Sequence, residues 1–164
     1  MYGLFTETDK NDSNIQIYHN IKFPLDDIID VLHPLFGTKY PFQEMIYTIY
    51  TVHHIFGAYD RQQGRCIACA LINNVSNNSG LYIMLFGVQQ SNQGHGIGTH
   101  LLEAIIQWAR EKGYRFINLH VHIENYKAIG LYEKSGFRKS QYIPNYYAHL
   151  QINPPHAFRM DLPL

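Results

Sequence analysis

The chain has 164 residues, which is the size of one folded domain with a substantial hydrophobic core. Thirteen basic residues balance thirteen acidic ones without clustering, which argues against a surface for nucleic acid. No apolar stretch approaches the roughly 20 residues of a membrane span, and residues 1–14 lack the features of a signal peptide. We therefore expect a single cytoplasmic domain, residues 1–164, with no nucleic-acid partner and no membrane anchor in this chain.

Hydrophobic periodicity predicts one strand and two helices in the first third of the chain. They cover residues 15–18, 25–35 and 41 or 42 to 50. Pro34 and Gly37 favour a break at the end of the first helix, because proline lacks the N–H group that a helix needs. The polar residues 1–14 before these elements are expected to be frayed.

Three strands follow, separated by polar turns, and this pattern predicts an antiparallel meander. They cover residues 53–59, 66–73 and 81–88. Cys66 and Cys69 form a Cys-x-x-Cys sequence on the second of these strands. Because successive residues of a strand face opposite sides, residues three apart are expected to point away from each other. We therefore interpret both cysteines as structural thiols, and we predict no metal site.

The last part of the chain alternates between helix and strand patterns. The elements cover residues 99–112 (helix), 116–123 (strand), 126–135 (helix), and 137–142 with 157–162 (hairpin). The strand 116–123 is expected to run parallel to 81–88, as the crossover rule requires. The pattern predicts an α/β (α+β) fold, in which about four helices flank a mixed, mostly antiparallel twisted sheet of about seven strands with one central parallel pair.

A glycine-rich turn, Gln93–Gly98, lies between the strand 81–88 and the helix that follows. Such a turn places backbone N–H groups and the positive end of the helix dipole around one point, which can hold a pyrophosphate. A P-loop requires Lys-Ser/Thr after the glycines, and the third glycine of the dinucleotide fingerprint is absent from the residues that follow Gly98. A different phosphate ligand is therefore expected.

Polar residues share one face of the strand 116–123, although a central parallel strand is usually apolar on both faces. They are Asn118, His120 and His122. These side chains could be hydrogen-bonded core residues or groups with a chemical role, and no third ligand for a metal is apparent. On the neighbouring strand, the same alternation predicts one shared face for Tyr82, Met84, Phe86 and Val88.

Several segments carry a more specific pattern. They are Leu81-Tyr82-Ile83-Met84, Gln93-x-x-Gly96-x-Gly98-Thr99, Leu119-His120-Val121, Asn125-x-x-Ala128-Ile129-x-x-Tyr132 and Gly136-Phe137. Together they resemble the GNAT family of acetyl-CoA-dependent N-acetyltransferases. Within that family, Asn145-Tyr146-Tyr147 and Phe36-Gly37-Thr38-Lys39-Tyr40 are similar to the protein N-terminal (N-alpha) acetyltransferases of the NatE and NatF catalytic-subunit types. The resemblance implies a GNAT fold, a splayed parallel strand pair, and acetyl-CoA (coenzyme A) as the cofactor.

The resemblance implies catalytic roles for Tyr82, His120 and Tyr132. Tyr82 and His120 flank the substrate amine and relay its proton through water, whereas Tyr132 lies near the thioester sulphur as an acid for the leaving thiolate. The backbone N–H of Val88 is assigned to the oxyanion. The cofactor-binding residues implied are Phe86, Val88, Gln93, Gly94, His95, Gly96, Ile97, Gly98, Thr99, Asn125 and Tyr132. Two of these have structural alternatives, since Asn125 could cap the following helix and Tyr132 could belong to its apolar stripe.

The resemblance also implies a peptide site. Its residues are Phe36, Gly37, Thr38, Tyr40, Met84, Tyr146 and Tyr147. Tyr146 and Tyr147 match a pair that closes over the peptide backbone, and Phe36 and Tyr40 match walls of the pocket for the initiator methionine. In the family pattern, a proline and a branched aliphatic residue stand where this chain has Gly37 and Thr38.

The expected function is acetyl transfer from acetyl-CoA to the free α-amine of protein N-termini that begin with Met and continue with a non-acidic or hydrophobic residue. The amine attacks the thioester directly in a ternary complex. The partner is then a peptide or protein N-terminus. The resemblance is also compatible with a ribosome-associated auxiliary subunit as a second partner. Two alternatives stay open: a GNAT lysine or small-amine N-acetyltransferase, and a non-catalytic acyl-CoA-binding or scaffold protein.

Overall fold

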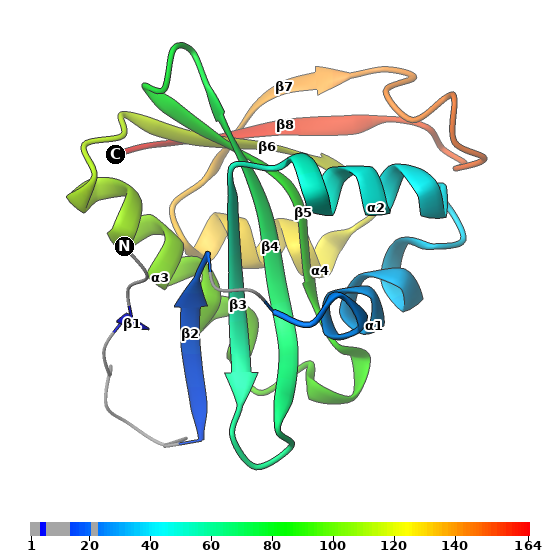
Figure 1. The fold of residues 1–164 in the computed structure, drawn as a ribbon. Helices are drawn as coiled ribbons and strands as arrows, with labels where there is room; N and C mark the ends of the chain where they lie inside the picture. The colour runs from blue at the N-terminus through cyan, green and yellow to red at the C-terminus, as the bar shows by residue number, and fades with distance from the viewer. Residues whose placement is uncertain (1–3, 6–13, 21–22) are drawn as a thin grey trace.

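The computed structural model describes residues 4–5, 14–20 and 23–164, which build one mixed sheet of eight strands (Figure 1). The strands lie in the order β1-β2-β3-β4-β5-β6-β8-β7. Their bounds are Leu4–Phe5 (β1), Ile15–His19 (β2), His54–Asp60 (β3), Arg65–Val75 (β4), Gly80–Val88 (β5), Phe116–His122 (β6), Arg138–Ile143 (β7) and Ala157–Pro163 (β8). Every neighbouring pair is antiparallel except β5 and β6, which are parallel. The predicted mixed sheet with one central parallel pair is confirmed.

The predicted count of about seven strands is confirmed, and the short strand β1 is the eighth. Leu4–Phe5 forms β1 and pairs with Tyr18 and Ile17 of β2, although it lies in the segment expected to be frayed. The other residues of that segment, 1–3 and 6–13, lie outside the described residues, so the expectation of fraying stays a prediction for them.

Four α-helices flank the sheet, as predicted. Their bounds are Leu25–Phe36 (α1), Phe42–Thr51 (α2), Ile97–Glu111 (α3) and Tyr126–Lys134 (α4), with a short 3-10 turn, η1, at Gln90–Asn92. Helices α1 and α2 cover one face of the sheet, and α3 and α4 cover the other (Figure 1). In the part of the chain that the structure describes, no helix is long and apolar enough to cross a membrane.

The helix predicted over residues 25–35 is confirmed as α1, which ends just before Gly37 and includes Pro34 in its last turn. The helix runs on to Phe36, and the N–H group of Gly37 reaches the carbonyl of His33 at 2.7 Å. A proline this close to a helix end removes one donor, and the cost is small when packing holds the last turn. That packing is close because β5 has glycine at position 87, where a Cβ atom would come within 2.8 Å of the Leu35 side chain.

A β-bulge in β4 shows that the expectation of Cys66 and Cys69 on opposite faces of the strand was wrong. Ala68 pairs with Ala58 and Cys66 pairs with Tyr59, so Ile67 is one extra residue in β4. The extra residue shifts the alternation by one, and Cys66 and Cys69 therefore face the same core, under α1 and α2. Both thiols are free and buried, and burial raises the pKa of each. A raised pKa keeps them protonated and unreactive, which agrees with structural thiols.

A second bulge, in β5, corrects the predicted shared face of four residues. Ile72 of β4 pairs with Ile83 and Leu71 pairs with Leu85, which leaves Met84 as the extra residue. Tyr82 and Met84 share the side of the sheet that α1 and α2 cover. Beyond the bulge, Phe86 and Val88 pack on the opposite side, against the core under α3 and α4. The bulge therefore redirects half of the predicted set to the other face of the sheet.

A cluster of histidine and aromatic side chains ties β2 and β3 to α3. His19 Nε2 lies 3.1 Å from His54 Nδ1, and His54 Nε2 lies 2.9 Å from Asn74 Oδ1. The His19 ring stacks on Phe56 with centroids 4.2 Å apart, and it meets Trp108 edge-on at 4.5 Å. Burial, helped by the charge of His54, lowers the pKa of His19 to about 4. Burial also lowers the pKa of His54.

We predict that His19 makes the folded state less stable in acid. Its pKa is about 6.5 in the unfolded chain and about 4 in the folded protein, so its contribution is complete above pH 6.5 and is lost as the pH falls toward 4. Because the ring is half exposed, we expect a loss of about 1–2 kcal/mol. Urea unfolding at several pH values measures it. His19→Phe, which cannot be protonated, should flatten the dependence, and an unchanged dependence would contradict the assignment.

Candidate active site

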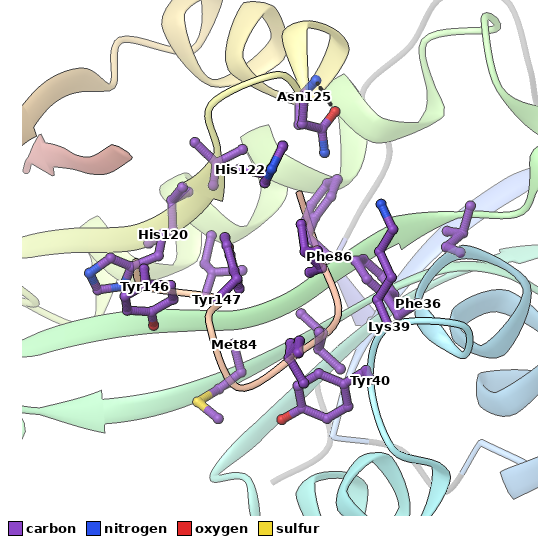
Figure 2. A pocket seen from close by; sticks show the side chains of 18 of the residues that line it. Phe36, Lys39, Tyr40, Met84, Phe86, His120, His122, Asn125, Tyr146 and Tyr147 are labelled. Atoms are coloured by element: carbon purple, nitrogen blue, oxygen red, sulfur yellow. Dashed lines mark hydrogen bonds between the residues drawn. The ribbon is translucent and has the colours of Figure 1, made fainter. Parts of the chain in front are cut away.

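A cleft of about 780 Å³ opens where β5 and β6 separate (Figure 2). The parallel ladder between the two strands ends at Ile83 and Leu119, one residue before the bulge at Met84. Beyond that point, the α1–α2 loop, the start of α4 and the β7–β8 loop complete the walls. The cleft therefore exists because the bulge and the end of the ladder coincide.

Half of the predicted site residues line this cleft. They are Phe36, Tyr40, Tyr82, Met84, Phe86, His120, Asn125, Tyr132, Tyr146 and Tyr147. They come from six separate elements or loops, so the fold brings together side chains that are up to about a hundred positions apart in the sequence. The other predicted residues lie outside the lining. They are Gly37, Thr38, Val88, Gln93, Gly94, His95, Gly96, Ile97, Gly98 and Thr99.

Tyr82 and His120 form a hydrogen-bonded pair across the two parallel strands. The Tyr82 hydroxyl lies 2.8 Å from His120 Nδ1. Burial raises the pKa of Tyr82, and its hydrogen bond to Tyr146 raises it further, so Tyr82 is a neutral phenol at pH 7. A neutral His120 that carries its proton on Nε2 accepts the phenol's hydrogen bond at Nδ1. The pair is therefore uncharged at rest and connected for proton transfer.

Tyr146 covers this pair from the β7–β8 loop. Its ring stacks on His120 with centroids 4.4 Å apart and an interplanar angle of 15°, and its hydroxyl lies 3.3 Å from that of Tyr82. Tyr147 packs perpendicular to Tyr146, with ring centroids 4.8 Å apart. The N–H of Tyr147 donates to the carbonyl of Pro155 at 2.8 Å, which ties the loop across its own base. These contacts fix the two rings over the Tyr82–His120 pair.

The strand β8 sets the electrostatic surroundings of His120. Arg159 pairs with His120 in the sheet register, and its guanidinium contacts the carboxylate of Asp161 at 3.1 Å. Burial lowers the pKa of His120, and the charge of Arg159 lowers it further, whereas the carboxylate of Asp161 acts in the opposite direction. His120 is therefore a neutral, weak base at physiological pH.

The glycine-rich turn leads into α3 as predicted. Gly94 and Gly96 have φ angles of 81° and 79°, a left-handed conformation that favours glycine. Gly96 is the N-cap of α3, and no side chain among the described residues caps this helix end. The first N–H groups of α3 therefore remain suited to an anion, and the helix dipole adds to their potential. The Ile97 side chain is buried in the core, so it supplies only its backbone there.

Gly98 and Gln93 join this turn to β5. A Cβ atom on Gly98 would lie 3.3 Å from the Val88 side chain, so glycine permits α3 to pack closely on the strand. Gln93 Nε2 donates to the carbonyl of Val88 at 3.0 Å. Both residues therefore anchor the turn to the end of the strand that forms the cleft.

Asn125 and Tyr132 belong to α4, and the structure gives each of them two environments. Asn125 is the N-cap of α4, where its side chain accepts from the N–H of Ala128 at 3.3 Å, and it also lines the cleft. Tyr132 lies in the core beside Phe86 and Phe137, yet it also reaches the cleft. Burial raises the pKa of Tyr132, so its hydroxyl keeps its proton. Both residues therefore have the structural role and also line the cleft, and their cofactor roles stay a prediction.

Five further lining residues with polar or charged side chains were not among the predicted site residues. They are Lys39, His122, Glu124, His149 and Asn153. His122 contacts the carbonyl of Pro154 and accepts from the N–H of Glu124 at 3.2 Å, so it links the β7–β8 loop to the start of α4. Its place two residues after His120 was a usable signal, since both side chains face the same way. No group of three His, Cys, Asp or Glu side chains suited to a metal occurs in the residues that the structure describes.

A comparison with protein families identifies the family of the chain. The acetyltransferase (GNAT) family matches residues 25–137, which run from α1 to the end of the segment after α4. The chain belongs to the GNAT family. The matched region includes Tyr82, His120 and the glycine-rich turn of this GNAT protein.

Two curated relatives are similar to part of the chain. "Probable N-acetyltransferase san" of Drosophila melanogaster is 35% identical over 95 residues, which cover 57% of this chain and 52% of that protein. "N-alpha-acetyltransferase 50" of Danio rerio is 32% identical over 95 residues, which cover 57% of this chain and 56% of that protein. The chain therefore spans about half the length of the curated relatives it matches.

Solved structures confirm the GNAT fold over nearly the whole chain. A GNAT family acetyltransferase from Elizabethkingia anophelis with acetyl-CoA bound has a TM-score of 0.77 at 21% identity, covering 93% of this chain and all of that chain. Arabidopsis thaliana Naa50 in complex with the bisubstrate analogue CoA-Ac-MVNAL has a TM-score of 0.68 at 22% identity, covering 91% of this chain and 98% of that chain.

We predict that Arg159→Met raises the pKa of His120. The change removes a nearby positive charge and leaves the carboxylate of Asp161 without its partner, and both effects favour the imidazolium form. NMR titration of the histidine ring signals measures the shift, and the spectrum of His120→Gln assigns the signal. Arg138→Met, on the exposed neighbouring strand β7, is the matched control and should leave that signal in place. A lowered or unchanged pKa in Arg159→Met would refute the electrostatic account.

Proposed function

We propose that this protein transfers the acetyl group of acetyl-CoA to the free α-amine of protein N-termini that begin with methionine. Membership of the GNAT family supports the acetyl donor. The similarity to N-alpha-acetyltransferase 50 of Danio rerio and to the Arabidopsis thaliana Naa50 complex supports the acceptor. The observation that carries the proposal is the Tyr82–His120 pair in the cleft, under the ring of Tyr146.

The residues at the end of β5 fit the donor. The N-terminus of α3 has N–H groups without a side-chain cap among the described residues, and Gly94 and Gly96 shape the backbone around them. Phe86 and Asn125 line the cleft between this turn and the Tyr82–His120 pair, where they suit the pantetheine arm. When bound there, acetyl-CoA supplies an acetyl thioester, which is an acyl group activated toward amines.

Tyr82 and His120 take up the proton that the attacking amine loses. The Tyr82 hydroxyl stands between the cleft and His120 Nδ1, so it can accept a proton from the amine through water while it passes its own to the imidazole. The imidazolium that forms gains from the carboxylate of Asp161 close by. Neither residue forms a covalent bond to the acetyl group, and the buried, protonated cysteines need no role.

The weakness of this base favours an α-amine over a lysine. An α-amine has an ordinary pKa near 8, so neutralising it at pH 7 costs about 1.4 kcal/mol, whereas a lysine amine near 10.4 costs about 5 kcal/mol. Burial and Arg159 keep the pKa of His120 low, so this base is suited to an α-amine, which needs less free energy to lose its proton than a lysine amine does. A lysine substrate would call for a stronger base or for carboxylates around the amine.

Two groups serve the leaving thiolate and the developing negative charge. Tyr132 keeps its proton and reaches the cleft from α4, which suits it as the acid for the thiolate. The backbone N–H of Val88 is proposed for the oxygen of the acetyl group, since Val88 lies at the end of β5 beside the glycine-rich turn.

An apolar wall opposite the catalytic pair suits the methionine side chain. Leu35, Phe36 and Tyr40 reach the cleft from α1 and the loop after it, and Met84 faces them from the bulge in β5. Apolar and aromatic surfaces attract a flexible thioether chain. Gly37 and Thr38 lie outside the lining, so their departure from the family pattern changes the loop backbone rather than the wall itself.

The proposal predicts acetylation of free N-termini. Peptides beginning with Met should be acetylated at the α-amine, because the base suits an amine of low pKa, whereas the same peptides with a blocked N-terminus and one free lysine should react at least about 10²-fold more slowly. Mass spectrometry locates the acetyl group, and thiol release measures the rate. Preferential reaction of the blocked set would favour a lysine acetyltransferase. Tight binding of coenzyme A without thiol release from any peptide would favour the non-catalytic alternative.

The proton relay predicts that Tyr82→Phe and His120→Gln lower kcat about 10²-fold and leave the affinity for acetyl-CoA nearly unchanged. Both changes keep the size of the side chain and remove one link of the relay. Steady-state kinetics and calorimetric titration with acetyl-CoA separate the two quantities. Tyr47→Phe, on an exposed position of α2, is the matched control. Undiminished kcat in either cleft variant would remove that residue from the relay.

A further inference from the structure

Lys39 is a cation at the peptide end of the cleft, and nothing in the reaction above uses it. It lies in the loop between α1 and α2, between the aromatic wall residues Phe36 and Tyr40, and its side chain lines the cleft (Figure 2). Within residues 4–5, 14–20 and 23–164, its ammonium group forms no ion pair and no hydrogen bond. A charged group that faces a ligand cleft without a partner can pair with a charge on the ligand.

The surroundings of Lys39 lack carboxylates. Two loops form the peptide end of the cleft, residues 37–41 and 144–156, and neither contains Asp or Glu in its sequence. The second loop adds His149 to the lining. The one acidic residue of the lining is Glu124, which lies outside these two loops and immediately precedes the N-cap of α4. The peptide end therefore favours a negatively charged side chain.

Lys39 also lies near the place of the substrate amine. The neighbouring Tyr40 is close enough to Tyr82 to contribute to its raised pKa, so the α1–α2 loop approaches the catalytic pair. An amine held at Tyr82 places the second and third residues of an extended peptide within about 4–7 Å of the first. These residues then pass the loop that carries Lys39.

We propose that Lys39 is a specificity-determining residue that selects peptides with Asp or Glu at the second or third position, directly after the initiator methionine. This inference rests on the proposed N-terminal acetyltransferase function, and it replaces the sequence-based expectation of a non-acidic second residue. Lys39 is exposed when no peptide is bound, so the ion pair forms in partly screened surroundings. We therefore expect a preference of about 3- to 10-fold in kcat/KM, which weakens as the salt concentration rises.

The test compares peptides that begin with Met and differ only in charge at one position. Glu, Gln or Lys stands at position two in one series and at position three in the other. For the unchanged protein, Glu should give the highest kcat/KM and Lys the lowest in at least one series. Lys39→Gln should remove the preference, and Lys39→Glu should reverse it. Lys134→Glu, the same change at the end of α4 and outside the cleft lining, is the control and should keep the preference.

Binding of the same peptides in the presence of coenzyme A is measured in parallel by fluorescence anisotropy. This measurement gives the preference for Glu over Gln and Lys even if no acetyl transfer occurs. Equal kcat/KM and equal affinity for all three peptides of both series would overturn the proposal. A change in the KM for acetyl-CoA that is the same for every peptide would overturn it too, because Lys39 would then contact the phosphates of the cofactor. Failure to acetylate any free N-terminus, with the binding preference intact, would count against the proposed function alone. Thermal unfolding checks that each variant is folded.

Discussion

The bulge at Met84 is the constraint on which the cleft depends. One extra residue in β5 coincides with the end of its ladder to β6, and it turns Phe86 and Val88 to the opposite face of the sheet from Tyr82. A bulge bends its strand and increases its twist, so the two parallel strands diverge from this point. The side facing α1 and α2 then carries Tyr82, and the side facing α3 and α4 leads to the glycine-rich turn. One irregularity in one strand thus gives the same opening two sides, which we propose for the peptide and the cofactor.

The electrostatics of the cleft suit a reaction that needs little help from a base. Tyr132 is a buried phenol and Tyr82 and Tyr147 are partly buried ones, and the raised pKa of all three keeps them protonated, whereas the pKa of His120 is lowered. Neutral groups avoid the cost of burying charge, and they hold hydrogen bonds that can pass a proton when one is released. The Arg159–Asp161 pair on β8 places opposite charges beside His120, so it holds the resting imidazole neutral and still stabilises the imidazolium.

Most of the fold followed from the sequence because periodicity is strong in its helices and strands. The parallel pair, the four helices and the glycine turn before α3 were all predicted from local patterns. The errors in the predicted strand faces share one cause. The alternation of residues along a strand in the sequence does not show where a bulge inserts an extra residue. The bulges at Ile67 and Met84 therefore reversed the inferred faces of Cys69 and Phe86. Among the site residues, the resemblance pointed to Tyr82 and His120, whereas the role of Lys39 required knowing which loops meet at the cleft.

A crystal structure with a bisubstrate analogue, in which coenzyme A is joined to the α-amine of a Met peptide, tests the central claim most directly. The account predicts the pyrophosphate on the N–H groups after Gly96, the pantetheine arm between β5 and β6, and the substrate nitrogen within one water of the Tyr82 hydroxyl. The peptide should leave the cleft between the α1–α2 and β7–β8 loops. An analogue bound outside the gap between β5 and β6, or one whose nitrogen lies on the Phe86 side of the sheet away from Tyr82, would contradict it.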